Sequence, residues 1–299
     1  MAKVHMILQG KGGVGKSFIA SILAQHYYAK KKNVLCIDTD PVNATFHGFK
    51  KLNVQRLDLM EGDEIDPRKF DDLIESISKS KTDVVIDNGA STFVALAHYL
   101  ISNQIPALLK NSGIELIVHT VITGGQALTD TLNGFKKMVK QFPDDVSFVV
   151  WLNPFWGKIE LEGKSFESLS VYLDNKNRVS AIIKIPEYKP ETFGRDLSEM
   201  LQAKLTFADA IKKPELTIMP IEHPNRKPTT VRQTGPACWI MVFIALPLVV
   251  GNSVGADQIG PGKHIDHTAF PFVDHFLPGR RRAGQRIGRH PPKIAGRHQ

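Results

Sequence analysis

The sequence predicts an α/β fold with a mainly parallel sheet covered by helices on both faces. Two observations indicate this class. Short, almost continuous apolar runs rich in Val and Ile alternate with longer stretches whose apolar residues recur at helical spacing. Strands of a sheet that is covered on both faces read in this way, because neither of their sides meets water. The pattern continues to about residue 220, so residues 1–219 are predicted to form one domain.

Six apolar runs predict the strands of this sheet. In chain order they are VHMILQ, NVLCID, VVID, IELIVHTVI, SFVVWL and VSAIIKI, over residues 4–9, 33–38, 84–87, 114–122, 147–152 and 179–185. Helices are predicted between them, over 16–32 and 125–142, where apolar residues have helical spacing. Residues 91–110 read as a further helix, broken or ended near Pro106, and a polar helix is expected from about Glu191 to Lys204.

A phosphate-loop pattern, Gly-x-x-x-x-Gly-Lys-Ser, links the first predicted strand to the first predicted helix. Glycines let backbone N–H groups turn toward an anion, and the helix N-terminus adds its positive dipole end. We expect Lys16 to reach the β- and γ-phosphates of a nucleotide and the Ser17 hydroxyl to bind Mg²⁺. This context predicts a P-loop NTPase whose nucleotide-binding residues are Gly10, Lys11, Gly12, Gly13, Val14, Gly15, Lys16, Ser17 and Phe18.

Carboxylates follow two of the predicted strands. Asp38 and Asp40 end the run CIDTDP, and Asp87 ends DVVID. Ligands of parallel sheets bind at the carboxyl edge, where a carboxylate can hold Mg²⁺ directly or through water, or orient an attacking water. We therefore expect Asp87 to act as a Walker B ligand of Mg²⁺. A solvated Asp-Pro turn is the alternative for Asp38 and Asp40.

Two further strand ends suggest a site for the base. An Asn at the end of SFVVWLN, Asn153, can pair its amide with an adenine edge, and Pro186 after the last strand can wall the base. An Asn-Pro turn and a simple strand-ending proline are the alternatives. His98 and His119 lie in apolar segments without partners at metal-ligand spacing, so we expect both to be satisfied core residues.

The excess of positive charge belongs to the end of the chain. Residues 1–220 hold 27 Lys and Arg against 26 Asp and Glu, whereas residues 221–299 hold 11 against 4. Residues 220–299 also show neither helical nor strand periodicity, and we expect them to form an atypical basic tail that is rich in Pro, Arg and His and disordered. We also expect this tail to come from a frameshifted or rearranged end of the gene. A genuine basic tail that touches DNA or anionic lipid is the alternative. The run 237–251 is too short to span a bilayer.

These residues together resemble the deviant Walker A family that includes ParA and MinD. The family's loop, KGGxGK[ST], matches residues 11–17, its DxDP element matches 38–41, and its Walker B aspartate and adenine-reading asparagine match Asp87 and Asn153. The resemblance implies an ATP-sandwich homodimer in which Lys11 reaches the partner's phosphates, Lys16 holds phosphate and Asp40 orients the hydrolytic water. After Pro41 this chain is one residue shorter than many relatives.

The resemblance also implies a biological role. Stretches such as CIDTDPVNATF, TDVVIDNGAS and FVVWLNP are similar to a conjugal-transfer member of the family. We therefore expect a slow, Mg²⁺-dependent ATPase that switches a protein partner of a conjugation apparatus. A partition ATPase with ATP-dependent DNA binding is the alternative, although residues 1–220 show no basic stripe. GTP remains open on the loop alone. With two cysteines and no signal peptide, we expect a cytoplasmic protein, with peripheral association at the inner membrane left open.

Overall fold

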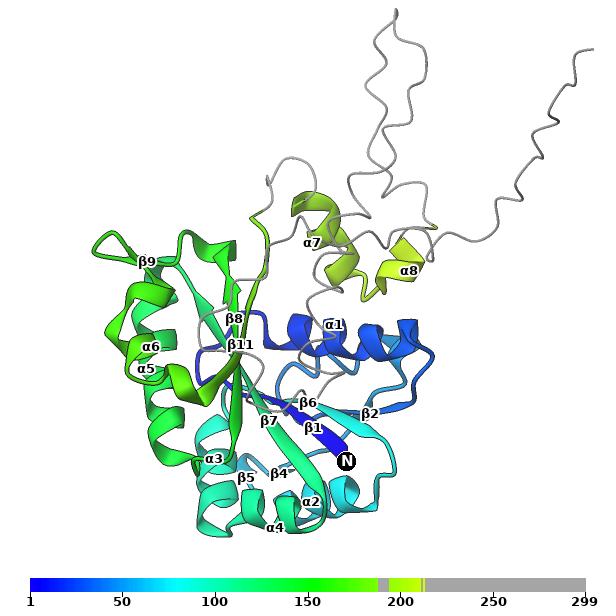
Figure 1. Ribbon diagram of the computed structural model, residues 1–299. Helices are drawn as coiled ribbons and strands as arrows, with labels where there is room; N and C mark the ends of the chain where they lie inside the picture. Colours follow the sequence, from blue (N-terminus) through cyan, green and yellow to red (C-terminus); the bar gives the residue numbers. More distant parts are fainter. Residues whose placement is uncertain (188–193, 211, 213–299) are drawn as a thin grey trace, which may run out of the picture. The chain divides into compact units, whose positions relative to one another are not determined.

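The computed structural model describes residues 1–187, 194–210 and 212 (Figure 1). Its centre is a seven-stranded sheet in the order β11-β8-β7-β1-β6-β2-β3, and every neighbouring pair is parallel. The strands are β1 (Ala2–Ile7), β2 (Val34–Asp38), β3 (Gln55–Arg56), β6 (Asp83–Asp87), β7 (Ile114–Thr123), β8 (Ser147–Asn153) and β11 (Val179–Lys184). The predicted parallel α/β sheet is confirmed.

Helices cover both faces of this sheet, as predicted. The helix α1 (Lys16–Ala29) lies on one face with α7 (Arg195–Gln202) and α8 (Phe207–Ala210) (Figure 1). The other face packs against α2 (Lys69–Lys79), α3 (Phe93–Ser102), α4 (Ile105–Asn111) and α5 (Leu128–Gln141). Alternate residues of each central strand therefore enter two separate apolar clusters, such as Val84 and Ile86 on one side and Val85 on the other.

Short elements complete the described chain. Two antiparallel hairpins pair β4 (Met60–Glu61) with β5 (Glu64–Ile65) and β9 (Glu160–Leu161) with β10 (Lys164–Ser165). The helix α6 spans Ser170–Leu173, and single 3-10 turns are η1 (Lys50–Leu52), η2 (Gly125–Ala127), η3 (Pro154–Trp156), η4 (Phe166–Ser168) and η5 (Lys176–Arg178). Within the described residues, no helix combines the length and apolar content that a membrane span requires.

Several predicted boundaries shift for local reasons. The break expected near Pro106 in the helix over 91–110 is confirmed: α3 ends at Ser102 and α4 begins at Ile105, because Gln104 adopts a left-handed φ of 51° and Pro106 lies in the first turn of α4. The helix expected over 125–142 begins with the turn η2 before α5. Residues 191–193 of the predicted polar helix and the whole tail, 220–299, lie outside the described residues.

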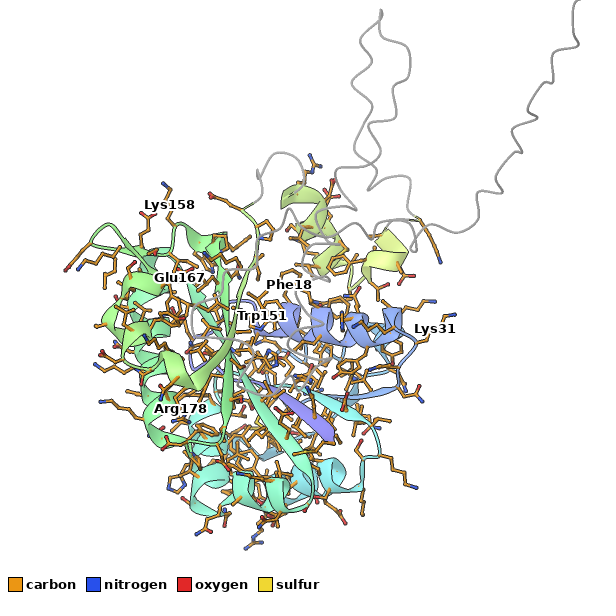
Figure 2. The ribbon with its side chains drawn as sticks, in the orientation of Figure 1. Phe18, Lys31, Trp151, Lys158, Glu167 and Arg178 are labelled. Carbon is orange, nitrogen blue, oxygen red and sulfur yellow. The ribbon has the colours of Figure 1, made fainter. Side chains whose placement is uncertain are left out.

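The two histidine predictions have different outcomes. His119 is a satisfied core residue, as expected: it accepts a hydrogen bond from Trp151 Nε1 at 3.0 Å and lies 2.9 Å from His5 Nδ1. Since an indole can only donate, the neutral His119 ring carries its proton on Nε2 and donates to His5. Burial lowers the pKa of His5 to about 3, so this pair stays neutral. Figure 2 shows Trp151 in the interior of the domain, between the sheet and α1. The prediction for His98 was wrong, because that side chain is exposed on α3.

Candidate nucleotide-binding site

The phosphate loop joins the end of β1 to the start of α1. Two glycines adopt left-handed backbone angles, Gly13 at φ 73° and Gly15 at φ 102°, which other residues rarely tolerate. A side chain at Gly15 would also lie 2.9 Å from the amide nitrogen of Asn153. The helix begins at Lys16, so its free N–H groups face the loop. This is the geometry that a nucleotide phosphate requires.

The Gln9 side chain holds Gly10, the first residue of the loop, by a hydrogen bond to its backbone N–H. Its side-chain oxygen accepts from Gly10 N at 2.9 Å, and its side-chain nitrogen donates to the carbonyl oxygens of Val121 and Thr131 at 3.0 and 3.2 Å. A side chain at Gly134 of α5 would overlap the Gln9 oxygen. The close packing of α5 against Gln9 therefore requires glycine at position 134. The sequence analysis missed Gln9, since nothing local marks a glutamine as the link between strands β1 and β7 and helix α5.

A second set of contacts holds the loop from the side of β8. Asn153 Nδ2 donates to Val14 O at 2.9 Å, while its Oδ1 accepts from Phe155 N at 3.2 Å. The indole of Trp156 donates to Gly13 O at 3.1 Å and remains 56% exposed. The predicted residue Asn153 is therefore at the loop, but its observed partners belong to the chain itself. Each of its two polar ends keeps unused hydrogen-bonding capacity, so adenine pairing stays a prediction.

The two lysines of the loop have different surroundings. Lys16 is buried and donates to Lys11 O at 3.0 Å. Burial lowers the pKa of Lys16, while the nearby carboxylates of Asp87 and Asp40 raise it. Lys11 instead points away from the buried cluster and forms an ion pair with Asp130 Oδ2 at 2.8 Å, in the first turn of α5. The buried ammonium of Lys16 is thus placed for phosphate, and Lys11 lies on the surface of its own subunit.

Asp87 is the most unusual group of the site. It is 1% exposed, and within the described part of the chain neither of its side-chain oxygens lies in good hydrogen-bonding geometry with a donor, although the Ser17 hydroxyl is near enough to lower its pKa. Burial, with a smaller contribution from the Asp38 carboxylate, raises the pKa of Asp87 to about 8 against the opposing influence of Ser17 and Lys16. Two unsatisfied carboxylate oxygens beside a loop hydroxyl fit Mg²⁺, which takes oxygen ligands and retains several waters. No group of three or more acidic, His or Cys side chains suited to a metal occurs among the described residues.

Asp38 and Asp40 shape the segment that follows β2. Asp38 is buried and accepts from Asp40 N at 3.0 Å and from His47 N at 2.8 Å. Burial raises the pKa of Asp38, and these backbone bonds oppose the rise. Asp40 Oδ1 accepts from Val42 N and Asn43 N at 3.0 and 3.2 Å. The turn alternative therefore describes Asp40 correctly, yet its carboxylate also faces the cavity.

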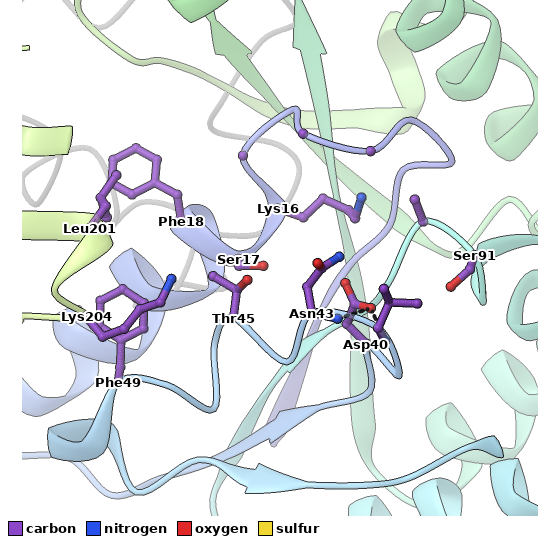
Figure 3. Close-up of a pocket in the computed structure, with 15 residues that line it drawn as sticks. Lys16, Ser17, Phe18, Asp40, Asn43, Thr45, Phe49, Ser91, Leu201 and Lys204 are labelled. Carbon is purple, nitrogen blue, oxygen red and sulfur yellow. Dashed lines mark hydrogen bonds between the residues drawn. The ribbon is translucent and has the colours of Figure 1, made fainter. Parts of the chain in front are cut away.

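A cavity of about 580 Å³ opens over these residues. Its polar end holds Lys16, Ser17, Asp40 and Asn43, and its other end brings together Phe18, Phe49, Leu201 and Lys204 (Figure 3). Gly12, Gly13, Gly15, Val42, Thr45, Ala90 and Ser91 complete the lining. Among the predicted site residues, Gly10, Lys11, Val14, Asp38, Asp87, Asn153 and Pro186 are not part of that lining. Pro186 is half-buried after β11, and the structure gives it no polar role.

Sequence comparison shows the family of this domain. The model of the CobQ/CobB/MinD/ParA nucleotide-binding domain matches residues 5–219. The chain belongs to this family. Two relatives, both called Protein TraL and both from Escherichia coli, are 64% and 62% identical over 219 residues, which is 73% of this chain and 91% of each relative. The resemblance to the ParA and MinD group is confirmed, and so is the P-loop fold.

Solved structures match this chain at lower sequence identity. The MinC:MinD cell division complex of Aquifex aeolicus matches at 16% identity with a TM-score of 0.47, covering 87% of this chain and all of that one. A putative plasmid partition protein of Borrelia burgdorferi bound to AMPPNP matches at 18% identity with a TM-score of 0.40, covering 71% of this chain and 95% of that one.

Proposed function

We propose that this chain is a slow Mg²⁺-dependent ATPase that forms a homodimer around bound ATP and acts in plasmid conjugal transfer. The observation that carries the proposal is the buried Asp87 beside Ser17 and Lys16 of the phosphate loop, whose two oxygens have no well-formed hydrogen bond among the described residues. A buried carboxylate without partners costs stability, and a bound cation offsets that cost. The conjugal role rests on the 64% identity with Protein TraL.

Each residue has a separate task in this proposal. The loop amides and Lys16 hold the phosphates, Ser17 and Asp87 bind Mg²⁺, and Asp38 supports the outer shell of the metal. When bound there, Mg²⁺ would supply positive charge beside the phosphates. Asp40 orients the attacking water, Asn153 and Pro186 receive the adenine, and Lys11 reaches the partner's phosphates. Phe18, which lies with Phe49 and Leu201 at the end of the cavity away from Asp40, supplies an apolar surface for the nucleoside.

Asp40→Asn tests the hydrolytic part of the proposal. The amide oxygen of Asn can still accept from Val42 N and Asn43 N, so the turn is kept while the negative charge is lost. We expect ATP to remain bound and phosphate release to fall by about 100- to 10,000-fold, as for loss of a general base or water-positioning group. Unchanged ATP turnover in the variant would show that Asp40 does not take part in hydrolysis. In the unaltered protein, hydrolysis of GTP at the same rate as ATP would contradict the adenine assignment.

The same variant identifies what the nucleotide state controls. If the protein switches a transfer apparatus, ATP-loaded Asp40→Asn protein should retain a protein partner that ADP-loaded protein releases. Retention of DNA that needs ATP and falls with salt would favour the partition function instead.

A further inference from the structure

Lys204 lies just beyond the C-terminus of α7 and lines the nucleotide cavity. Its backbone adopts a left-handed φ of 52°. Its N–H donates to Leu201 O at 3.2 Å, and the next N–H, of Leu205, donates to Met200 O at 3.0 Å. These two bonds close the helix in the usual way, through one left-handed residue. Glycine or asparagine is the common residue of such a turn, so the turn itself does not require a lysine.

The Lys204 side chain packs along the cavity wall. A side chain at Gly48 would lie 3.0 Å from Lys204 Cγ and 3.2 Å from its Cδ, so the methylene stem lies against the Gly48 backbone. The ammonium lies 5.9 Å from the centre of the Phe49 ring, within the range of a cation–π contact. Figure 3 shows this nitrogen directed from the apolar end of the cavity toward Ser17 and Thr45. The stem is therefore held while the charged end faces the cavity.

The charge of Lys204 has no carboxylate partner within the described part of the chain, where no ion pair includes this lysine. Among the described residues that line the cavity, Asp40 is the only carboxylate, and it lies at the opposite end (Figure 3). A cation–π contact at a partly exposed site is weak and uses none of the three ammonium N–H donors. The ammonium is therefore available to an anion inside the cavity.

The position of this ammonium indicates which anion it meets. In the proposed function, Lys16 holds the β- and γ-phosphates at one end of the cavity and Phe18 faces the nucleoside at the other. The α-phosphate joins these two parts of the nucleotide, so it must lie between them, on the side toward which Lys204 points.

We propose that Lys204 binds the α-phosphate of the nucleotide. This inference rests on the proposed function, because the orientation of the nucleotide is taken from it. A charge-assisted hydrogen bond between an ammonium and a phosphate oxygen is among the stronger polar contacts. Since ATP, ADP and AMP share the α-phosphate, the contact raises the affinity for all three by the same factor, and it joins the end of α7 to the bound nucleotide.

The test is the affinity of the full chain for a non-hydrolysable ATP analogue, ADP, AMP and adenosine, measured by displacement of a fluorescent ADP analogue in the presence of Mg²⁺. Lys204→Met keeps the apolar stem against Gly48 and Phe49 but removes the charge. It should weaken binding of the three nucleotides by about 10- to 100-fold each and leave adenosine unchanged. Lys204→Arg, which keeps a cation, should restore most of the lost affinity.

Lys50→Met is the matched control, because Lys50 is an exposed lysine beside Phe49 that does not line the cavity. It should leave all four affinities unchanged. The thermal midpoint of each variant shows whether the fold is retained.

The other outcomes separate this inference from the function on which it rests. Unchanged nucleotide affinities for Lys204→Met, or an equal loss in the Lys50→Met control, overturn the inference. An equal loss for adenosine also overturns it, because the lysine would then contact the ribose or the base. A loss confined to the ATP analogue overturns it as well, since the contact would then be to the γ-phosphate. If the unaltered protein binds neither the ATP analogue nor ADP, the proposed function itself fails.

Discussion

The side-chain amide of Asn153 donates a 2.9 Å hydrogen bond to the carbonyl oxygen of Val14. This bond joins the carboxyl end of β8 to the middle of the phosphate loop, 139 residues away in the sequence. A side chain at Gly15 would meet the same amide, so the loop and Asn153 fit each other closely. Asn153 consequently has two candidate roles, as an anchor of the loop and as a reader of adenine.

Asn153→Ala separates these two roles. Loss of the anchor leaves the buried Val14 carbonyl without this donor, and we expect a loss of unfolding free energy of about 1–3 kcal/mol. If Asn153 only anchors the loop, ATP and GTP affinities should fall by the same factor. If it also reads adenine, calorimetric titration should show a larger loss for ATP than for GTP. Unchanged stability would contradict the anchoring role.

Asp87→Asn tests the cost of the unpartnered carboxylate. The pKa of Asp87 rises from its ordinary 3.8 to about 8 in the folded chain, so between these values the native state holds a proton that the unfolded chain has released. The unaltered protein, free of metal and nucleotide, should therefore lose stability as pH rises from about 4 to 8, by an amount on the order of a few kcal/mol.

An asparagine at position 87 does not titrate, so the variant should show a flatter pH dependence and a higher thermal midpoint at pH 8. It should also lose Mg²⁺-dependent hydrolysis, which distinguishes a functional cost from a folding defect. Chemical denaturation at several pH values measures the first effect. Identical pH profiles for the two proteins would show that Asp87 is not protonated in the fold.

Gly124→Ala tests the close approach of two backbone segments beside the loop. A side chain at Gly124 would overlap the carbonyl oxygens of Gly157 and Lys158, which follow the turn that carries Trp156. Its φ of −82° is ordinary, so the cost is steric alone, and we expect about 3 kcal/mol of lost stability, the upper end of what overpacking usually costs, because the atoms overlapped belong to the backbone. Gly113→Ala is the matched control, with a left-handed φ of 74° and open space around it, and should cost only about 1–2 kcal/mol. Equal losses of unfolding free energy for the two variants in chemical denaturation would contradict the close packing of Gly124 against Gly157 and Lys158.

The parts of the fold that follow from local pattern were predictable. The strands that deliver Asp38, Asp87 and Asn153 are continuous apolar runs, and a buried parallel sheet gives that signal directly. The helix α2 went unpredicted although its buried residues, Phe70, Leu73, Ile74 and Ile77, have helical spacing and could have revealed it. Strands of two residues, such as β3, are too short for any periodicity to show.

The contacts within the site were less accessible to the sequence. The phosphate loop was visible because its residues are consecutive and each has a known chemical task. By contrast, Lys11 meets Asp130 and Gln9 meets Thr131 only after the chain has folded, across separations of 119 and 122 residues. Nothing in LTDT marks Asp130 as the partner of a loop lysine, since an acidic residue in the first turn of a helix is ordinary.

The most direct test of the account is the molar mass of the protein with Mg²⁺ and ATP. Light scattering on the Asp40→Asn variant, in which hydrolysis is blocked, should give twice the mass of one subunit with ATP and the mass of one subunit with ADP. Adding Lys11→Ala should return the ATP-bound protein to a single subunit while nucleotide stays bound. An unchanged dimer fraction in the Lys11→Ala protein would contradict the claim that this lysine acts across two subunits.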